Sequence, residues 1–286
     1  MTGTLKHIQA KLKYFYGIAR RAESIYALLA RMYREPLLAA EKTADPRALT
    51  PYGFSAYSQT DEDGIFQEIF RRIGTTNKTL IDFGCAEGVE NNTTYLILTG
   101  WRGLWMDGGA ANIRKCRRDF RQQVEAGRLT LKHAFITREN INELIREAGL
   151  PKEIDILSID IDGNDYWIWE AIDCVSPRVV AIEYNTTFRP PAKVVQVYDA
   201  QYRPNYSNDF GASLKALECL GARKGYSLTG CSFSGANAFF VRNDLVKDLF
   251  SAPFTAEHHY REPQYDAFVR GYNSHRKAIG LYEVIE

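Results

Sequence analysis

Residues 79 to 88 read Thr-Leu-Ile-Asp-Phe-Gly-Cys-Ala-Glu-Gly. The first five are mostly apolar and predict a buried strand, which runs directly into a turn that carries two glycines. In open α/β sheets, ligands bind outside the carboxyl ends of the parallel strands. We expect Gly84 to let the chain turn tightly and Gly88 to let a ligand lie against the backbone without a Cβ clash. The segment therefore predicts a ligand site at one edge of a parallel sheet.

Strand-like and helix-like segments alternate on both sides of this turn. Strands are expected at 79–83, 103–106, 129–136, 154–159, 178–182, 226–232 and 237–242, and helices at 64–73, 92–98, 112–125, 138–148, 166–172 and 212–223. Thr60-Asp-Glu-Asp63 fits a capping box in front of the first of these helices. The alternation is typical of a parallel sheet with helices on both faces, and the last two strands should form an antiparallel hairpin. The expected fold class is a Rossmann-like α/β domain with seven mostly parallel strands.

The first 50 residues differ from the rest and predict an amphipathic helical extension. Apolar residues recur every three or four positions from Leu5 to Met32, with Lys and Arg between them, and Pro36 should end the helix. We expect the apolar seam to pack on the domain or on a second subunit of a homo-oligomer. A basic amphipathic helix that rests peripherally on an anionic membrane surface is the alternative. The expected boundaries are 1–50 for the extension, 51–250 for the main domain and 251–286 for a C-terminal tail.

The composition limits the function classes. The chain has 286 residues, 45% of them apolar, and a formal net charge of +1. Sequence-independent binding of nucleic acid needs a strongly basic face, and a net charge of +1 gives no support for one. We therefore expect a small-molecule or glycan acceptor as partner and no nucleic acid. The five cysteines form no C-x-x-C pair, and neither a signal peptide nor a transmembrane stretch is evident in the sequence. A cytoplasmic protein with reduced thiols is therefore expected.

The turn after the first strand is acidic and lacks the G-x-G-x-x-G of a dinucleotide phosphate loop, because Ala86 stands at the second glycine position. S-adenosylmethionine has no pyrophosphate, so an acidic turn that meets its ammonium group suits it better. Asp107 ends the next strand, where a carboxylate can accept hydrogen bonds from both ribose hydroxyls. A glycine turn with an unrelated loop aspartate is the simpler alternative. The expected cofactor-binding residues are Asp82, Gly84, Glu87, Gly88, Asn92, Asp107, Phe135 and Asp160, of which Phe135 would line an adenine pocket or belong to the core.

A second group of acids follows the central strands, in Asp160-Ile-Asp-Gly163 and in Glu183-Tyr-Asn185. Because these strand ends meet at the edge that also holds Asp82, we expect Asp160, Glu183 and Asn185 to converge on Mg²⁺ or Mn²⁺. Asp160 and Asp162 are the expected catalytic residues. They alternate along an extended segment, so their side chains should point in different directions and leave Asp162 to act as the general base. Ordinary Asp-Gly turn chemistry is the alternative.

Together with Tyr57-Ser-Gln59, Glu62-Asp-Gly64 and Asn237-Ala-Phe-Phe-Val-Arg242, these motifs resemble the FkbM-type methyltransferases. The resemblance covers about residues 54–245. It implies a class I fold, S-adenosylmethionine as cofactor, and O-methylation of sugar, polyketide or polysaccharide hydroxyls. Asp160-x-Asp162 is also similar to the D-x-D of metal-dependent sugar O-methyltransferases of macrolide tailoring, in which the first acid binds the metal and the second is the base. Those enzymes carry two adjacent acids at the next strand end, where this chain has Glu183-Tyr-Asn185.

The expected function is therefore S-adenosylmethionine-dependent O-methylation of a sugar or polysaccharide hydroxyl, with or without a metal. A long polar loop at 185–209 carries Tyr198, Tyr202 and Tyr206, which are suited to stacking on a sugar ring. Two alternatives stay open. One is a Rossmann-type nucleotide-sugar oxidoreductase, and the other is a non-catalytic oligomeric scaffold with the methyltransferase fold.

Overall fold

The computed structural model describes residues 2–204, 207–264, 267, 268 and 279. Seven strands form its central sheet: β1 (Thr79–Phe83), β2 (Arg102–Asp107), β3 (Leu129–His133), β4 (Glu153–Ile159), β5 (Ser176–Glu183), β6 (Tyr226–Cys231) and β7 (Asn237–Arg242). They lie in the order β3-β2-β1-β4-β5-β7-β6. β1 to β5 pair in parallel, whereas β7 runs antiparallel to both β5 and β6. The predicted fold class is confirmed, including the antiparallel hairpin at the edge.

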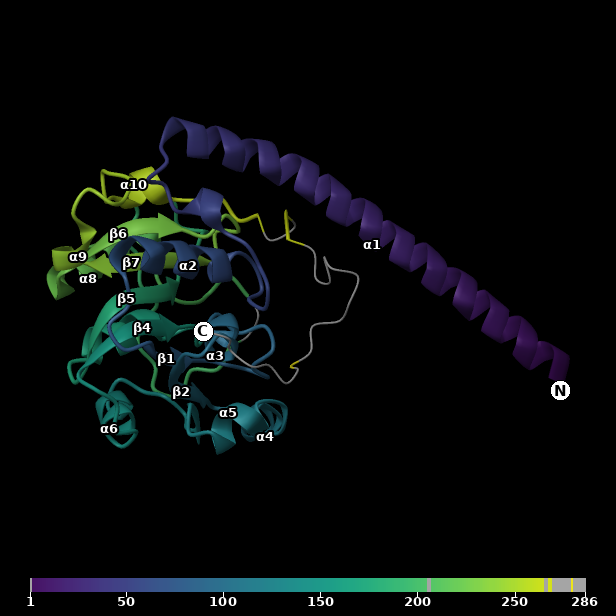
Figure 1. The fold of residues 1–286 in the computed structure, drawn as a ribbon, viewed down its shortest axis with the longest axis horizontal. Coiled ribbons are helices and arrows are strands. Elements are labelled where there is room, and N and C mark those ends of the chain that lie inside the picture. The colour runs from purple at the N-terminus through teal and green to yellow at the C-terminus, as the bar shows by residue number, and fades with distance from the viewer. Residues whose placement is uncertain (1, 205–206, 265–266, 269–278, 280–286) are drawn as a thin grey trace.

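The helices of the described residues begin with α1 (Thr2–Ala44), the short 3-10 turn η1 (Thr50–Tyr52), α2 (Glu62–Ile73) and α3 (Thr94–Leu98). They continue with α4 (Ala110–Asp119), α5 (Arg121–Glu125), α6 (Ile141–Arg146), α7 (Asp165–Ala171), α8 (Leu214–Lys224), α9 (Asn243–Val246) and α10 (Ala256–His259). Figure 1 shows these elements around the sheet, with α1 extending away from them.

Two helix predictions need correction. The helix expected from residue 64 begins at Glu62, and Thr60 does not cap it: the Thr60 hydroxyl donates to the Glu62 carboxylate at 2.6 Å instead. The single helix expected at 112–125 is divided at Phe120, whose fully buried ring packs edge-on against Trp105 with centroids 4.8 Å apart. The strand predictions hold to within three residues at each end.

The sheet is buried on both faces, which explains why β1, β4 and β5 are nearly continuous apolar runs. α6, α7 and α8 cover one face, where Trp169 and Leu217 belong to its apolar cluster. α2, α3 and α4 cover the other face, where Phe66 and Trp105 are fully buried. Because the five neighbouring strands β3, β2, β1, β4 and β5 are parallel, the turns that follow them meet at one edge of the sheet. We call this the carboxyl edge.

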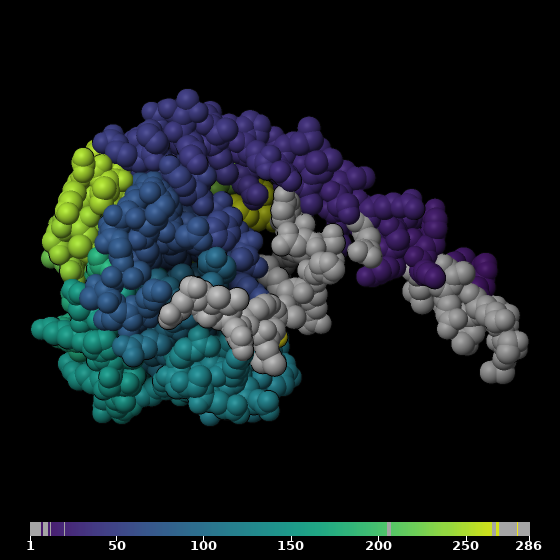
Figure 2. All heavy atoms as spheres, viewed as in Figure 1, coloured from purple at the N-terminus to yellow at the C-terminus, as the bar shows by residue number. Residues whose placement is uncertain are grey.

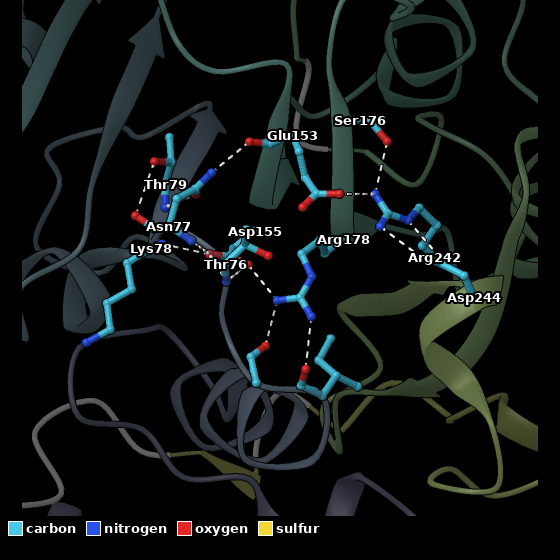
Figure 3. Close-up of polar contacts among 12 residues, drawn as sticks. Thr76, Asn77, Lys78, Thr79, Glu153, Asp155, Ser176, Arg178, Arg242 and Asp244 are labelled. Atoms are coloured by element: carbon cyan, nitrogen blue, oxygen red, sulfur yellow. Dashed lines mark hydrogen bonds and ion pairs between the residues drawn. The ribbon is translucent and has the colours of Figure 1, made fainter.

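The opposite edge, which we call the amino edge, is held together by a buried ion pair (Figure 3). Asp155, on β4, accepts hydrogen bonds from the backbone N–H groups of three successive residues, Thr76 to Lys78, at 2.7–3.1 Å. Its other partner is Arg178, on β5, whose Nη1 donates to the carboxylate at 2.8 Å. The same guanidinium donates to two carbonyls at the end of α2, at 2.7 and 2.9 Å. This network ties β4, β5 and the chain between α2 and β1 together.

The N-terminal helix is longer than predicted. α1 continues through Pro36 to Ala44, so the prediction that Pro36 ends it is wrong. A proline removes one backbone donor, and the Leu-Leu-Ala-Ala run after it consists of good helix formers that extend the helix.

One of our predictions required the apolar seam of α1 to pack on the domain. Among the described side chains, most of this seam does not. Phe15, Ile25 and Met32 of the apolar seam are 60–63% exposed. Contacts of α1 with the rest of the chain include a hydrogen bond from Arg34 to the Ala267 carbonyl at 3.2 Å and an ion pair between Glu41 and Arg261. The Lys42 ammonium lies 4.2 Å from the ring centroid of Tyr52. Figure 2 shows the helix leaving the body beyond these contacts. Within the described part of the chain, no helix has a stretch long and apolar enough to cross a membrane.

Candidate active site

A cavity of about 400 Å³ opens at the carboxyl edge of the sheet. Its walls come from the turns after β1, β2, β3 and β4, and include Gly84, Asp107, Phe135 and Asp160. The long loop after β5 closes one side with residues 202 to 204. Cavities of this size hold cofactor-sized molecules, and the edge of the sheet that carries this one is where open α/β sheets bind ligands.

Gly84 and Gly88 both serve close packing within the protein. Gly84 has a φ of +77°, and a Cβ on it would lie 1.6 Å from the carbonyl oxygen of Asp160. Glycine therefore lets the turn after β1 touch the chain that leaves β4. Gly88 has a φ of +80°, but a Cβ there would meet the Phe120 ring at 2.8 Å and the Cys116 sulfur at 3.0 Å. The prediction that a ligand lies against Gly88 is wrong, because α4 and Phe120 occupy that side.

Asp82 lies behind the cavity wall. It is fully buried and accepts a hydrogen bond from the Thr93 hydroxyl at 2.6 Å, and Thr93 in turn accepts one from the Trp105 indole at 2.9 Å. The second carboxylate oxygen, Oδ1, has no partner among the described residues. Burial raises the pKa of Asp82 to about 7. Asp82 therefore supports the turn from inside and makes no direct contact with the cavity.

Two other predicted cofactor ligands also lie outside the cavity. Glu87 is exposed and forms an ion pair with Lys115 on α4. Asn92 is buried, and its side-chain amide donates to the Ser158 hydroxyl at 3.4 Å. Neither side chain lines the cavity, so both predictions need correction. The turn directs its Glu87 side chain to solvent and not to the strand end.

Asp107 does line the cavity, and three hydrogen-bond donors fix the position of its two carboxylate oxygens. Its Oδ2 accepts from the Ala86 backbone N–H at 2.8 Å. Its Oδ1 accepts from the Gly109 backbone N–H at 2.6 Å and from the Asn112 side-chain amide at 3.0 Å. Each carboxylate oxygen can accept two hydrogen bonds, so acceptor capacity remains on Oδ2 for one hydroxyl. Sequence reasoning missed Asn112, which lies in the first turn of α4 and also borders the cavity.

Phe135 borders the cavity with 40% of its surface exposed, so it is not a core residue. The guanidinium carbon of Arg203 lies 3.8 Å from its ring centroid. Tyr202, next to it, lies against Gly163: a Cβ on that glycine would be 2.3 Å from the Tyr202 ring. Of the three predicted sugar-stacking tyrosines, Tyr202 lines the cavity, Tyr198 bonds to Glu139 away from it, and Tyr206 lies outside the described residues.

Three carboxylates meet beside this cavity. One oxygen from each of Asp160, Asp162 and Glu183 lies within 4.8 Å of the other two. We call these residues the acid cluster. The prediction that Asp160 and Asp162 point apart is wrong, because β4 ends at Ile159 and strand alternation ends with it. Asp162 has a φ of +55°, a left-handed conformation that brings its carboxylate back towards that of Asp160.

No cation from the described residues pairs with the acid cluster. Burial, together with repulsion from neighbouring carboxylates, raises the pKa values of Asp160 and Glu183 well above their ordinary range. Burial also raises the pKa of Asp162. The Oε2 atom of Glu183 is buried without a hydrogen-bond partner. The cluster therefore needs either bound protons or an external cation.

Asn185 is not part of this cluster. Its side-chain amide donates to the carbonyls of Asn208 and Phe210 at 2.9 and 2.8 Å, and its Oδ1 accepts from the Thr187 N–H at 2.9 Å. The predicted metal ligand Asn185 is therefore wrong: it fastens the two ends of the long loop. Asp162, predicted only as the base, takes its place among the converging oxygens.

No family model matches the chain, and no curated protein matches it in sequence. Among solved structures, the N-terminal domain of EvdMO1 with SAH bound is 14% identical, with a TM-score of 0.40, over 73% of this chain and 94% of that chain. M. capricolum TrmK in complex with S-adenosyl-homocysteine is 13% identical, with a TM-score of 0.40, over 62% and 67%. The [4+2]-cyclase SpnF is 12% identical, with a TM-score of 0.39, over 71% and 74%. Likeness at this level assigns no activity to this chain.

Proposed function

We propose that the protein is an S-adenosylmethionine-dependent methyltransferase that acts on a sugar or polysaccharide hydroxyl with the help of a divalent metal ion. The observation that carries this proposal is the joining of two features in one place. A cofactor-sized cavity ends in Asp107 and Phe135 on one side, and on the other side it reaches Asp160 and Asp162 of the acid cluster. One side of the cavity is thus suited to binding a cofactor, and the other side is suited to binding a proton or a metal ion.

The residues present fit the cofactor. Asp107 keeps acceptor capacity for a ribose hydroxyl, and Phe135 offers a ring face for a planar base. Bound S-adenosylmethionine would supply a methyl group on a positively charged sulfur, which accepts the bonding electron pair when the methyl group leaves. The acidic lining of the cavity suits a ligand with positive charges and no phosphate.

The residues also fit a hard cation. The three acids offer oxygen ligands only, which is the donor set of Mg²⁺ and Mn²⁺, and the partnerless Glu183 Oε2 marks a missing positive neighbour. A bound ion would supply Lewis-acid stabilisation of an acceptor oxygen. Asp162 is the exposed member of the cluster and lines the cavity, so its carboxylate is accessible to an acceptor hydroxyl. We therefore assign it to accept the hydroxyl proton during transfer.

A sugar acceptor is supported by the position of Tyr202. Its ring lies against Gly163, directly after Asp162, and both Tyr202 and Asp162 line the cavity. An aromatic face beside a carboxylate is a common way to hold a sugar ring and one of its hydroxyls.

The oxidoreductase alternative is opposed by a contact in the first turn. The Ala86 N–H, at the second glycine position of a dinucleotide loop, donates to the Asp107 carboxylate. The amide is therefore not free for a pyrophosphate, and the carboxylate next to it would repel one. Thermal-shift measurements should show stabilisation by S-adenosylhomocysteine and none by NAD. Stabilisation by NAD alone would favour the oxidoreductase, and a response to neither would favour the scaffold.

The metal and base assignments are tested together. On a sugar acceptor that the wild-type protein methylates, EDTA should suppress turnover and Mg²⁺ or Mn²⁺ should restore it. Asp162→Asn should lower kcat about 100-fold or more, while S-adenosylhomocysteine still binds in isothermal titration. Glu87→Gln, an exposed acid outside the cavity, is the matched control and should have no effect. Full activity in EDTA would contradict the metal requirement, and normal turnover of Asp162→Asn would contradict the assignment of Asp162 as the base.

A further inference from the structure

The exposed part of α1 has a composition that the proposed catalytic site does not explain. Residues 1–33 contain six Lys or Arg and one acidic residue, Glu23. The rest of the chain carries 30 basic and 34 acidic residues. The positive charge of the protein is thus concentrated on the helix that extends away from the body (Figures 1 and 2).

The same segment exposes a continuous apolar face. Phe15, Ile18, Ile25, Leu29 and Met32 are 45–63% exposed. Their spacing of three, four and seven residues places them on one side of the helix, in a stripe about 100° wide or more. Lys13 lies on the other side of the helix from Phe15 and is exposed. An apolar stripe of this extent is rarely left in water, so it points to an interaction surface.

The described part of the body of a second copy offers no apolar partner for this stripe. Outside α1, the large apolar side chains that are exposed among the described residues are Phe54, Phe135 and Val197. They come from three separate segments, and Phe135 belongs to the cavity. Docking of the stripe on a neighbouring body would therefore leave it largely uncovered.

A second α1 is also a poor partner. Stable coiled coils place residues of opposite charge beside a narrow apolar seam. Here the charges that flank the stripe are almost all positive, so two such helices side by side would bring like charges together, which is destabilising. An anionic membrane surface avoids both problems, because it attracts the basic side chains and takes the apolar side chains out of water.

We propose that α1 is an anchor that lies on a membrane surface containing anionic lipids, with its apolar stripe inserted between the headgroups and its basic side chains at the lipid phosphates. A helix with a basic polar face and an apolar face with Phe, Leu and Ile has the composition of interfacial helices. At about 1.5 Å per residue, the 43-residue helix is about 65 Å long. Its contacts to the body through Glu41 and Lys42 would hold the domain at the membrane.

Vesicle flotation of the full-length protein tests this anchor, which does not depend on the proposed catalytic activity. The protein should float with vesicles of phosphatidylcholine and phosphatidylglycerol, bind those of phosphatidylcholine alone at least tenfold more weakly, and be released by high salt. Ile25→Ser/Leu29→Ser should abolish binding by removing the inserted side chains. Lys13→Glu/Arg21→Glu should weaken it about 20-fold or more, since each basic residue near an anionic surface contributes about fivefold.

A matched control carries the same charge reversal on the body. Lys152→Glu/Lys193→Glu changes two exposed lysines far from α1 in sequence and should leave vesicle binding unchanged. Circular dichroism checks that each variant stays helical. Failure of the wild-type protein to float, equal binding to neutral vesicles, or loss of binding in the control would each overturn the proposal. So would a solution dimer that Ile25→Ser/Leu29→Ser dissociates in the absence of any vesicle binding.

Discussion

The strand pair β4 and β5 carries carboxylates at both edges of the sheet, and the protein surrounds those at the two edges differently. At the amino edge, Asp155 receives three backbone N–H groups and the guanidinium of Arg178 (Figure 3). At the carboxyl edge, Asp160 and Glu183 approach each other and Asp162, and no basic side chain of the described residues pairs with them. The same pair of strands therefore ends in a compensated charge on one side and in uncompensated charges on the other.

This difference distinguishes acids that stabilise the fold from acids that are suited to function. A buried carboxylate is costly unless it is paired and hydrogen-bonded, and Asp155 meets both conditions. The acid cluster meets neither from within the chain, and its raised pKa values are the result. Strongly perturbed acids at the edge of a cavity are typical of functional sites, whereas a saturated ion pair is typical of a structural one.

The largest change in stability is expected from removing the buried ion pair at the amino edge. Asp155→Asn leaves the Arg178 guanidinium buried without its counter-charge, and should lower the free energy of unfolding by about 3–5 kcal/mol. Urea denaturation measures this. Glu153→Gln is the matched control: it removes the partner of Arg242 in a more exposed ion pair and should cost about 1 kcal/mol or less. Equal losses in the two variants would contradict the special role of Asp155.

A smaller effect is expected from pH. Burial raises the pKa of Asp82 to about 7 from an unfolded value near 3.8. Between these pH values the unfolded state has released a proton that the folded state retains, so stability falls as pH rises from about 4 to about 7. Asp61, buried with a pKa of about 7, contributes in the same direction. The expected loss from Asp82 is about 4 kcal/mol, since its pKa rises by about three units and one unit corresponds to about 1.4 kcal/mol.

Asp82→Asn should flatten this dependence, because the amide does not titrate. Urea unfolding at pH 5 and pH 8 provides the comparison. A wild-type protein that is more stable at pH 8, or a variant with an unchanged slope, would show that Asp82 is ionised without cost in the folded state.

Asp107 sharpens the comparison, because it lies at the carboxyl edge and, like Asp155, is held by three N–H donors, but its Oδ2 keeps capacity for one more hydrogen bond. Asp107→Ala should weaken the binding of S-adenosylhomocysteine by about 1–3 kcal/mol, measured by isothermal titration, through loss of a charged acceptor for a ribose hydroxyl. Glu87→Ala is the control and should bind normally, since that side chain is exposed outside the cavity. Unchanged affinity in Asp107→Ala would make Asp107 a structural residue like Asp155.

The smallest expected effect is an increase in stability. Glu183→Gln removes one of three mutually repelling carboxylates, so in metal-free buffer at pH 8 it should raise the free energy of unfolding by about 1 kcal/mol. Mn²⁺ should stabilise the wild-type protein against thermal unfolding and should have less effect on the variant. Destabilisation by Glu183→Gln in metal-free buffer would mean that the carboxylate is compensated after all.

Much of the fold could be predicted from local patterns. The bounds of β1 and β7 agree with the sequence expectation, because an apolar run followed by a turn with glycines leaves few alternatives. Helix ends were less accurate. Pro36 lies inside α1, since the loss of one hydrogen bond is outweighed by helix-forming neighbours. The division at Phe120 depends on its packing against Trp105, which no local pattern reveals.

The candidate site could be predicted only where backbone direction decides it. Asp107 and Asp160 were expected at the carboxyl edge, and both border the cavity there. Glu87 and Asn185 follow strand ends in the sequence, but their turns direct them elsewhere. Arg203 comes from a long loop whose path depends on tertiary contacts, so neither periodicity nor spacing could place it over Phe135.

That placement of Arg203 has a kinetic consequence. Its guanidinium covers the ring face of Phe135 at 3.8 Å, and Tyr202 beside it rests on Gly163. A planar heterocycle that stacks on that face has to displace the guanidinium, so this part of the loop must open first. Association then contains a first-order step that precedes binding, and the observed rate in stopped-flow mixing should level off at the opening rate as ligand concentration increases. The loop thereby limits how fast the cavity fills, and because only the open fraction binds, it also lowers the apparent affinity for the ligand.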